Sequence, residues 1–445
     1  MIYFSAPTES PRFMTRFFRL PLLAALVVMP FLAACTDPEA ALVEKARGIH
    51  ERVITLDTHV DISPANFTEE RNYTEDLPVQ VNLPKMKEGG LDVAWFVVFV
   101  GQGPLNDSGY TAATASAIEK FNAIHWLAEQ KAPDQIEIAY TSDDVRRIAA
   151  SGKKVAMIAI ENGYQVGTDL SNIQRFQEQG GRYMSFSHNG HSQLADSNTG
   201  ERDSTWLHGG LSELGRQAVA EMNRVGMMID ISHPAKTSNL QMMELSAAPV
   251  MASHSSARAL NNVSRNLDDE ELLALKENGG VVQTVAFAGY VNEAKAERNR
   301  AAADSIRSVI ATEMGIQPVD RRTMFTMTPE QRDSVRAAMQ PLNDAVAARQ
   351  TEIDSIAPPV DVADFVNHID YLVKLIGIDH VGISSDFDGG GGVKGWADAS
   401  ETFNVTLELV RRGYTEEEIA KMWSGNLLRV LDEVQRVAAE LQNRG

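Results

Sequence analysis

Hydrophobic and polar positions alternate along this chain in two rhythms, short apolar runs and longer amphipathic stretches, from residue 53 onward. Amphipathic segments such as 112–130, 212–225, 268–277 and 362–376 place apolar residues three and four apart, which is the spacing of a helix. Strands that alternate with helices indicate a parallel sheet with crossover helices, so the pattern predicts an α/β fold, a (β/α)8 TIM-type barrel. The eight apolar runs that predict its strands begin at Val53, Leu91, Lys154, Tyr183, Gly226, Pro249, Gly280 and His380.

One segment breaks this rhythm between the seventh and eighth predicted strands. Residues 292 to about 357 are rich in Ala, Arg, Glu, Asp and Gln and keep a helical period, so we predict a helical insertion there. Helices predicted at 402–412, 415–423 and 425–441 complete the chain. Because barrels of this type often exceed 250 residues and tolerate insertions, residues 35–445 are predicted to form a single domain.

The N-terminal segment 1–34 has the pattern of a signal peptide, in which two arginines precede an apolar run too short for a stable membrane span. It ends in Leu32-Ala33-Ala34-Cys35, which resembles the lipobox of bacterial lipoproteins. We therefore expect lipid on Cys35 and a periplasm-facing place in the cell envelope, with Thr36 favouring the outer membrane. The alternative is an ordinary secretory signal followed by a lone buried thiol. Translation could begin at Met1 or at Met14, where the signal-like pattern starts.

The charge balance excludes one class of partner. The full chain has a formal net charge of −19, and removing the leader, which carries three arginines and one glutamate, leaves about −21. Such a surface repels nucleic acid, so no nucleic-acid partner is expected.

Potential metal ligands stand at the C-terminal ends of the apolar runs. They are His59 and Asp61 after VITL, Glu161 after VAMIAI, His233 after GMMIDIS and His254 after PVMAS. Residues two apart in a strand share a face, and a carboxylate such as Glu161 is costly to bury unless a cation neutralises it. Strand ends of a barrel meet at one face, so this series predicts a metal site there. Five ligands exceed the usual three of a single catalytic zinc, which favours two zinc ions with Glu161 as the bridge.

Two further residues fit hydrolytic chemistry at such a centre. Asp386 follows the eighth predicted strand and is a candidate proton shuttle, whereas Asp388, before a run of glycines, fits a turn. His188 ends the fourth predicted strand and could hold the substrate carbonyl or its oxyanion, with His191 as the competing candidate.

Taken together, these motifs resemble the membrane dipeptidase, or renal dipeptidase, family of the metal-dependent amidohydrolase superfamily. The resemblance spans residues 48 to 290 and 360 to 430 and is carried by LDTHVD, AIENG, SHNGHSQLADS, IDISHP, ASHSSAR, SRNLDDEEL and SSDFDG. It implies a zinc-dependent dipeptidase in which a metal-bound hydroxide attacks the peptide bond. It assigns one zinc to His59 and Asp61 and the other to His233 and His254, with Glu161 between them.

The same resemblance implies that His188 contacts the substrate carbonyl, that Asp386 transfers the proton, and that Arg265 grips the substrate's C-terminal carboxylate, work suited to a planar guanidinium. Tyr290 is similar to a further substrate-contact tyrosine. The resemblance also implies dipeptide substrates that include a C-terminal D-residue, and a homodimer is one possible assembly. Other readings are a different amidohydrolase, such as an N-acyl amino acid deacylase or β-lactam hydrolase, and a non-catalytic metal-binding lipoprotein.

Overall fold

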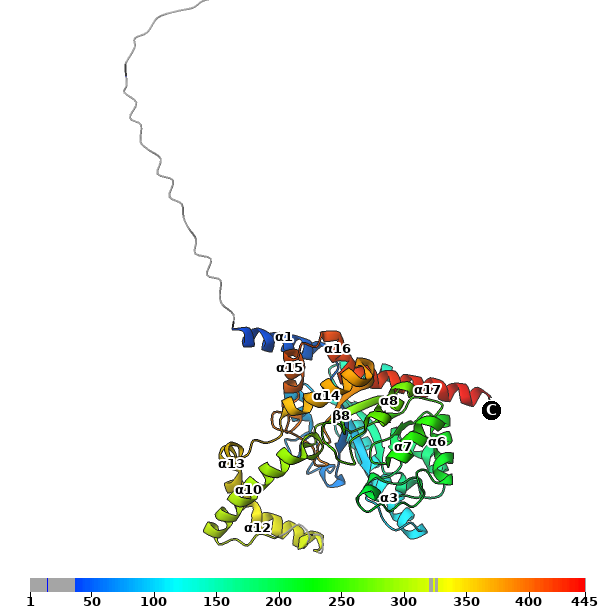
Figure 1. The fold of residues 1–445 in the computed structure, drawn as a ribbon, viewed down its shortest axis with the longest axis horizontal. Coiled ribbons are helices and arrows are strands. Elements are labelled where there is room, and N and C mark those ends of the chain that lie inside the picture. Colours follow the sequence, from blue (N-terminus) through cyan, green and yellow to red (C-terminus); the bar gives the residue numbers. More distant parts are fainter. Residues whose placement is uncertain (1–13, 15–36, 320–322, 325–326, 445) are drawn as a thin grey trace, which may run out of the picture.

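A computed structural model describes residues 14, 37–319, 323–324 and 327–444 (Figure 1). The predicted lipidation site Cys35 and all of the predicted leader except Met14 lie outside the described residues. The described strands are β1 Leu56–Asp61, β2 Val93–Phe99, β3 Ile136–Ile138, β4 Lys154–Glu161, β5 Gly181–Ser185, β6 Met228–Asp230, β7 Met251–Ala252, β8 Val281–Val285 and β9 Val381–Ser384.

Eight of these strands form the predicted barrel wall. All of their pairings are parallel and follow the order β1-β2-β4-β5-β6-β7-β8-β9. The wall closes where the amide of Asp61 donates to the carbonyl of Phe387 at 2.9 Å, just beyond β9. The predicted α/β barrel is therefore confirmed. Strand β3 was not predicted; it lies outside the wall and pairs only with the start of β4.

Helices cover the outside of the wall or, between β8 and β9, project from it. The longer ones are α1 Pro38–Arg52, α3 Asp107–His125, α4 Ser142–Ala150, α5 Ser171–Glu178, α6 Glu213–Val225, α7 Lys236–Leu245, α8 Asp269–Asn278, α10 Glu293–Met314, α12 Pro329–Ala347, α14 Val362–Ile376, α15 Phe403–Arg411 and α17 Asn426–Arg444. The short ones are α2 Leu83–Gly89, α9 Ala288–Val291, α13 Gln350–Ile356 and α16 Glu416–Ala420. Single 3-10 or π turns are η1 Pro64–Asn66, η2 Trp126–Lys131, η3 Gly163–Val166, η4 Asn198–Arg202, η5 Ile378–His380, η6 Ala399–Glu401 and η7 Lys421–Gly425.

The helix limits follow from local chemistry. Helix α8 begins at a capping box, in which Asp268 accepts from the amide of Glu271 and Glu271 accepts in return from the amide of Asp268. It ends at Gly279, whose φ of 81° lies in the left-handed region that glycine adopts without strain.

Alternate residues of the strands enter two different hydrophobic clusters, as the two-residue period of a strand requires. On β2, Trp95 belongs to an inner cluster with residues of the other strands, and α17 closes that cluster with Leu427 and Leu431. The neighbouring Phe96 packs outward in a second cluster that includes Phe121 of α3. Side chains therefore fill the barrel interior, and the ends of the strands are left to build a site.

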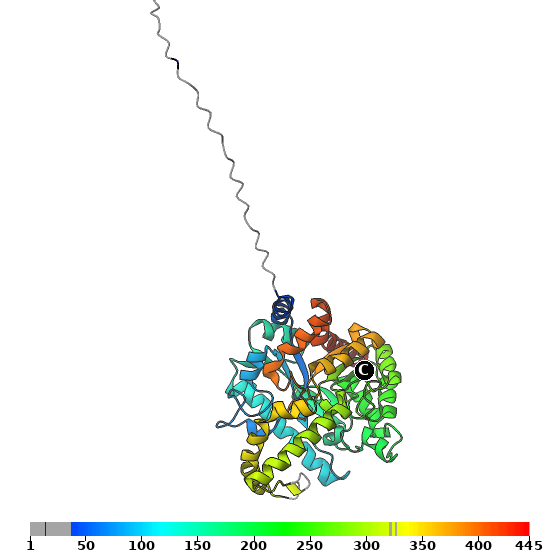
Figure 2. The same cartoon turned by 60° about the vertical axis from the view of Figure 1, so that its left-hand side comes forward.

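Between β8 and β9, helices α10, α12 and α13 extend away from the barrel (Figures 1 and 2). They share a small core of their own, formed by Ala302, Ile306, Ile310, Ala311, Leu342, Ile353 and Ala357. We call these three helices the helical arm. Because its apolar residues are buried within the arm itself, it forms a packing unit beside the main core.

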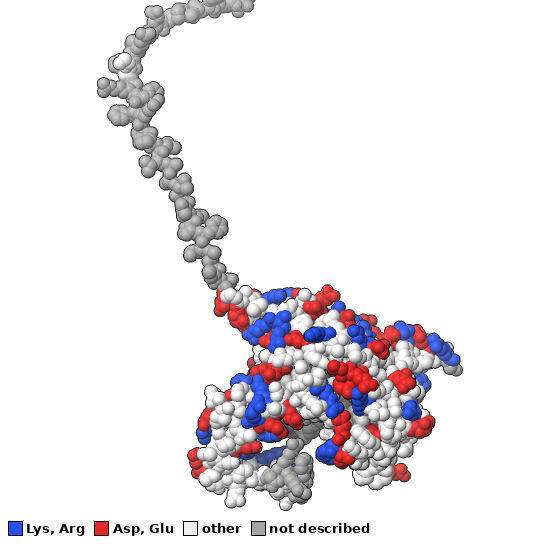
Figure 3. Space-filling view, viewed as in Figure 1, with Lys and Arg blue, Asp and Glu red and all other residues white. Residues whose placement is uncertain are grey.

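The described surface carries charges of both signs. Acidic and basic side chains are interspersed over the face shown in Figure 3. Within the described part of the chain, no helix combines the length and the apolar character needed to span a bilayer.

Candidate active site

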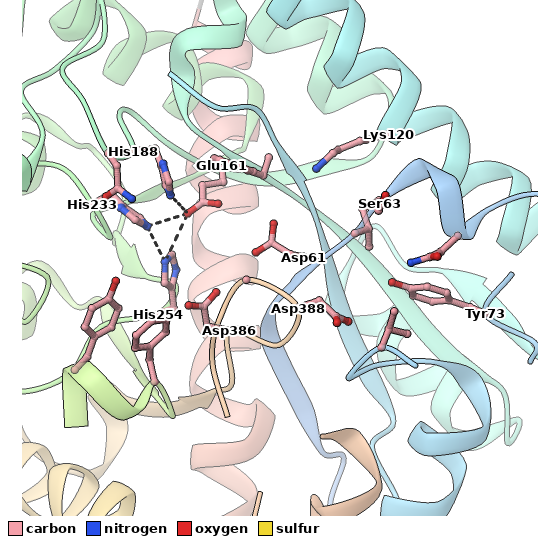
Figure 4. A pocket seen from close by; sticks show the side chains of 18 residues that line it. Asp61, Ser63, Tyr73, Lys120, Glu161, His188, His233, His254, Asp386 and Asp388 are labelled. Carbon is pink, nitrogen blue, oxygen red and sulfur yellow. Dashed lines mark hydrogen bonds and ion pairs between the residues drawn. The ribbon is translucent and has the colours of Figure 1, made fainter. Parts of the chain in front are cut away.

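The predicted site residues meet at the C-terminal ends of the strands, and all of them except His59 and Arg265 line a cavity of about 600 Å³ (Figure 4). Asp61 ends β1 and Glu161 ends β4, while His188, His233, His254 and Asp386 lie in the loops that follow β5, β6, β7 and β9. The lining residues are Asp61, Ile62, Ser63, Asn66, Tyr73, Val79, Phe99, Lys120, Glu161, His188, Asn189, His233, His254, Phe287, Tyr290, Asp386, Asp388 and Gly389.

Glu161 occupies the centre of this cluster and is 3% exposed. Its Oε2 lies 3.6 Å from Nε2 of His59, on the side where Asp61 also approaches that nitrogen, at 3.7 Å. Its other oxygen, Oε1, lies 3.0 Å from Nε2 of His233 and 3.6 Å from Nε2 of His254. The two oxygens thus face two different groups of nitrogens.

Hydrogen bonds fix which nitrogen of His59 carries the proton. The hydroxyl of Tyr183 donates its single proton to the carbonyl of Thr58 at 2.9 Å, so its oxygen can only accept from Nδ1–H of His59, also at 2.9 Å. The remaining nitrogen, Nε2, is therefore the one that can bind a metal once it has lost its proton. It has no hydrogen-bond partner among the described residues and faces two carboxylates.

A second relay fixes His254 in the same way. Asp230 accepts a hydrogen bond of 2.6 Å from the hydroxyl of Ser253, whose oxygen accepts in turn from Nδ1–H of His254 at 2.7 Å. Its Nε2 lone pair then lies 3.0 Å from Nε2 of His233. Such outer-shell partners, a hydroxyl or carboxylate behind each imidazole, are usual behind metal-binding histidines.

The donor set fits a metal. Ligand atoms around a tetrahedral zinc with bonds of about 2.0–2.1 Å lie roughly 3.3 Å apart, and the spacings between Glu161, His233 and His254 run from 3.0 to 3.6 Å. Converging lone pairs of nitrogen and carboxylate oxygen repel one another unless a cation lies between them. The residues of the site therefore fit a metal cofactor.

The electrostatics of the site show the same demand for positive charge. Burial alone would lower the pKa of His59, but the surrounding carboxylates, Glu161 first, raise it to about 10. Burial holds the pKa of His233 and of His254 well below the usual range, so both are neutral and able to donate a lone pair. Burial also opposes ionisation of Glu161, but nearby imidazoles keep the pKa of its carboxyl well below the usual range.

Two site residues sit in strained backbone. His233 has a φ of 79° and Asp386 a φ of 60°, a region that residues other than glycine rarely adopt. Such conformations cost about 1–3 kcal/mol each and cluster at functional sites. Oδ1 of Asp386 lies 4.0 Å from Nε2 of His59, and burial raises the pKa of Asp386 well above its ordinary value.

The structure distinguishes between the two candidate histidines, His188 and His191. Nε2 of His188 lies 3.9 Å from Glu161, and its side chain lines the cavity. His191 is not among the lining residues; its Nδ1 accepts from the amide of Ser197 at 3.0 Å in the following loop. The structure therefore brings His188 and not His191 to the site.

Arg265 and Tyr290 lie together beside His254. The Arg265 guanidinium stands 5.2 Å from the centroid of the Tyr290 ring and donates to the carbonyl of His254 at 3.2 Å. Tyr290 lines the cavity, whereas Arg265, 6% exposed, is packed behind the lining residues. The buried Nε–H of Arg265 has no partner among the described residues, which leaves one donor available to an anion.

Several cavity residues escaped the sequence analysis. Lys120 of α3 and Tyr73 reach the cavity opposite His188 and His233 (Figure 4). Asp388, predicted as a turn residue, does have a left-handed φ of 62° and accepts from the amide of Gln80 at 2.9 Å, but it lines the cavity as well. The sequence signal for Lys120 was its place on a helix stripe with the buried Ala113, Ala117, Phe121 and Ile124.

Comparisons with known proteins agree on one family. Residues 43–445 match the family described as Membrane dipeptidase (Peptidase family M19). The chain is 30% identical over 382 residues to Dipeptidase aclJ of Aspergillus oryzae, covering 85% of this chain and 74% of that one. A solved structure, the probable dipeptidase PvdM from Pseudomonas aeruginosa, superposes with a TM-score of 0.72 at 34% identity, over 90% of this chain and 100% of that one. A metallo peptidase from Rhodobacter sphaeroides, liganded with a phosphinate mimic of the dipeptide L-Ala-D-Ala, shares the fold at 21% identity, with a TM-score of 0.64 over 86% of this chain and 99% of that one.

Proposed function

The chain belongs to the membrane dipeptidase family and is a metallo-dipeptidase, and on that premise we propose that it uses two zinc ions and accepts dipeptides with a C-terminal D-residue. One observation carries the count of two ions. The oxygens of Glu161 face separate groups, with His59 on one side and His233 with His254 on the other. The extension to D-residues depends on the family resemblance of the sequence motifs.

Zinc ions bound there would polarise the scissile carbonyl and lower the pKa of the attacking water. The chain's own residues do the rest. His188 lines the cavity beside Glu161, where it can donate to the oxygen on which negative charge develops. Asp386, whose pKa is raised by burial, stands on the same side as His59 and can carry a proton toward the departing nitrogen.

Arg265 is proposed to hold the substrate's terminal carboxylate. Its guanidinium is buried next to Tyr290 and keeps one unpaired Nε–H, and a buried cation with a free donor is stabilised by an anion. A carboxylate held at this end places the peptide bond over the cluster around Glu161.

Turnover of a substrate panel tests this function. Zinc-reconstituted enzyme is offered L,L and L,D dipeptides, dipeptide amides, N-acyl amino acids and a β-lactam. We expect fast hydrolysis of the free dipeptides, slow hydrolysis of the dipeptide amides, and no turnover of the N-acyl amino acids or the β-lactam. Asp386→Asn should lower kcat by about 10²–10⁴-fold with both zinc ions retained, while the exposed control Asp134→Asn should match the native enzyme.

Arg265→Ala should lower kcat/KM for free dipeptides by about ten- to a hundredfold, chiefly through KM, and leave dipeptide amides unaffected. Turnover of N-acyl amino acids or the β-lactam without any dipeptide hydrolysis would contradict the proposal. A bound-metal ratio of one per chain would contradict the two-ion centre.

We also propose that the mature chain begins at Cys35 and is held by lipid on the periplasmic side of the envelope. The lipobox-like sequence Leu32-Ala33-Ala34-Cys35 supports this proposal. Mass spectrometry of the N-terminal peptide from bacterial membranes should find a diacylated Cys35. An unmodified thiol on a soluble protein would contradict it.

A further inference from the structure

The cavity has a second compartment beyond the metal-ligand cluster. Figure 4 shows Lys120, Ser63 and Tyr73 on the far side of Glu161 and Asp61 from His188 and His233. Asn66 and Val79 line the same cavity. We call the part lined by Ser63, Asn66, Tyr73, Val79 and Lys120 the distal compartment.

Lys120 is directed into this compartment by the helix that carries it. It lies on the stripe of α3 whose other members, including Ala117 and Phe121, are buried against the barrel. Its ammonium passes over the ring of Phe99, 5.5 Å from the centroid. Burial lowers the pKa of Lys120, as expected for a cation drawn away from bulk water.

This ammonium has no polar partner in the described part of the chain. Among the residues that the structure describes, none forms a hydrogen bond or an ion pair with Lys120 within 4.0 Å. Asp61 and Glu161 act on it only at longer range, and both face the cluster of imidazoles. With cations bound in that cluster, the charges of Asp61 and Glu161 are already matched, which leaves Lys120 in need of an anion.

The neighbouring groups in the compartment are donors as well. The side-chain oxygen of Asn66 accepts a hydrogen bond from Nε of Arg71 at 2.6 Å, so its side-chain N–H groups remain free to donate. The hydroxyls of Tyr73 and Ser63 have no hydrogen-bond partner among the described residues. A lysine, an amide and two hydroxyls without partners form a site for an oxygen-rich, negatively charged group.

The orientation of the bound dipeptide determines which of its groups enters the distal compartment. On the proposed function, on which this inference rests, Arg265 holds the C-terminal carboxylate beside His254, so the first residue of the dipeptide points to the opposite side. Its α-ammonium carries the same charge as Lys120 and is matched by the carboxylate of Asp388, which lines the same cavity. Lys120 therefore remains free to bind the side chain of the first residue.

We propose that Lys120 makes this enzyme selective for dipeptides whose first residue has an acidic side chain, with Ser63, Asn66 and Tyr73 completing the carboxylate site.

A matched substrate pair tests the charge directly. Glu-Ala and Gln-Ala have nearly the same shape and differ in one negative charge. We expect kcat/KM of the zinc-loaded native enzyme to be about ten- to a hundredfold higher for Glu-Ala, mainly through KM. Equal values for the two dipeptides would overturn the proposal.

Three variants separate charge recognition from a structural role. In Lys120→Met the ratio between Glu-Ala and Gln-Ala should fall to about one, and Lys120→Arg should restore most of it. Lys120→Glu should reverse the preference, so that Lys-Ala is cleaved faster than Glu-Ala. The exposed Lys45→Met is the control and should keep the native ratio.

A loss of the same size for all dipeptides in Lys120→Met would show that the lysine has only a structural role, and the proposal would be wrong. If the native enzyme hydrolyses no dipeptide, the proposed function fails. Calorimetric binding of Glu-Ala against Gln-Ala still decides the role of Lys120 in that case: tighter binding of Glu-Ala supports it, and equal binding overturns it.

Discussion

Replacing Tyr183 by Phe tests whether the proton arrangement of His59 prepares the metal site. The hydroxyl of Tyr183 is buried inside the barrel and joins Nδ1–H of His59 to the carbonyl of Thr58, with both distances at 2.9 Å. Its removal leaves a buried donor and a buried acceptor unpaired, which costs about 1–3 kcal/mol of unfolding free energy. It also frees His59 to carry its proton on Nε2, the nitrogen that faces Glu161 and Asp61.

The expected result is a zinc dissociation constant raised by about 10–100-fold, which corresponds to about 1.4–2.7 kcal/mol. Competition with a chromophoric chelator measures it without any enzyme turnover. Tyr140→Phe is the matched control, because the Tyr140 hydroxyl has no hydrogen bond among the described residues, and the contact of its ring with the Arg182 guanidinium, 5.1 Å from the centroid, is kept by Phe. If Tyr183→Phe holds zinc as tightly as the native chain, or if both variants weaken equally, the tautomer reasoning is wrong.

Two further predictions concern stability. Burial raises the pKa of Glu271 to about 7, so the folded state binds this proton more tightly than the unfolded state does. The resulting stabilisation, about 3 kcal/mol of unfolding free energy, is fully present below pH 4.5 and is lost as the pH rises through about 7. Chemical denaturation across that range should show a weaker pH dependence in Glu271→Gln, and an unchanged slope would refute the assignment. Leu342→Ala removes a fully buried side chain from the core of the helical arm and should lower stability by about 2–5 kcal/mol. Hydrogen exchange should accelerate in the arm while kcat/KM stays native, and faster exchange in the barrel strands instead would show that the arm is not a separate packing unit.

Residue periodicity was sufficient to predict the barrel, because buried parallel strands are nearly continuous apolar runs. The run over 154–161 became β4 with its predicted limits, and the carboxylate at its end indicated a metal ligand only in combination with the other four candidates. Other predicted strands were longer than the observed ones. The run from Pro249 contributes only Met251–Ala252 to the ladder, although the carbonyl of Val250 still accepts from the amide of Val281 at 3.2 Å.

The missed residues look ordinary in sequence. Tyr183 is an aromatic side chain in an apolar strand, indistinguishable from a core residue until the barrel brings its hydroxyl to His59. Lys120 has the composition of any surface lysine, and only the stripe it shares with Ala117 and Phe121 marks it as inward-facing. The positive φ of Asp386 depends on how the loop after β9 closes over the cavity, which no local pattern encodes.

The weakest part of the ladder explains how stability and metal binding are joined. Strands β6 and β7 share a single register pair, Asp230 with Met251, yet they precede His233 and His254. The buried carboxylate of Asp230 replaces missing backbone hydrogen bonds between these strands, because it accepts from the amides of Ser232 and Ser253 at 2.9 and 2.8 Å. It also accepts from the Ser253 hydroxyl that orients His254. One carboxylate therefore holds the barrel wall together and sets the lone pair of a metal ligand, so a change that disturbs either role disturbs both.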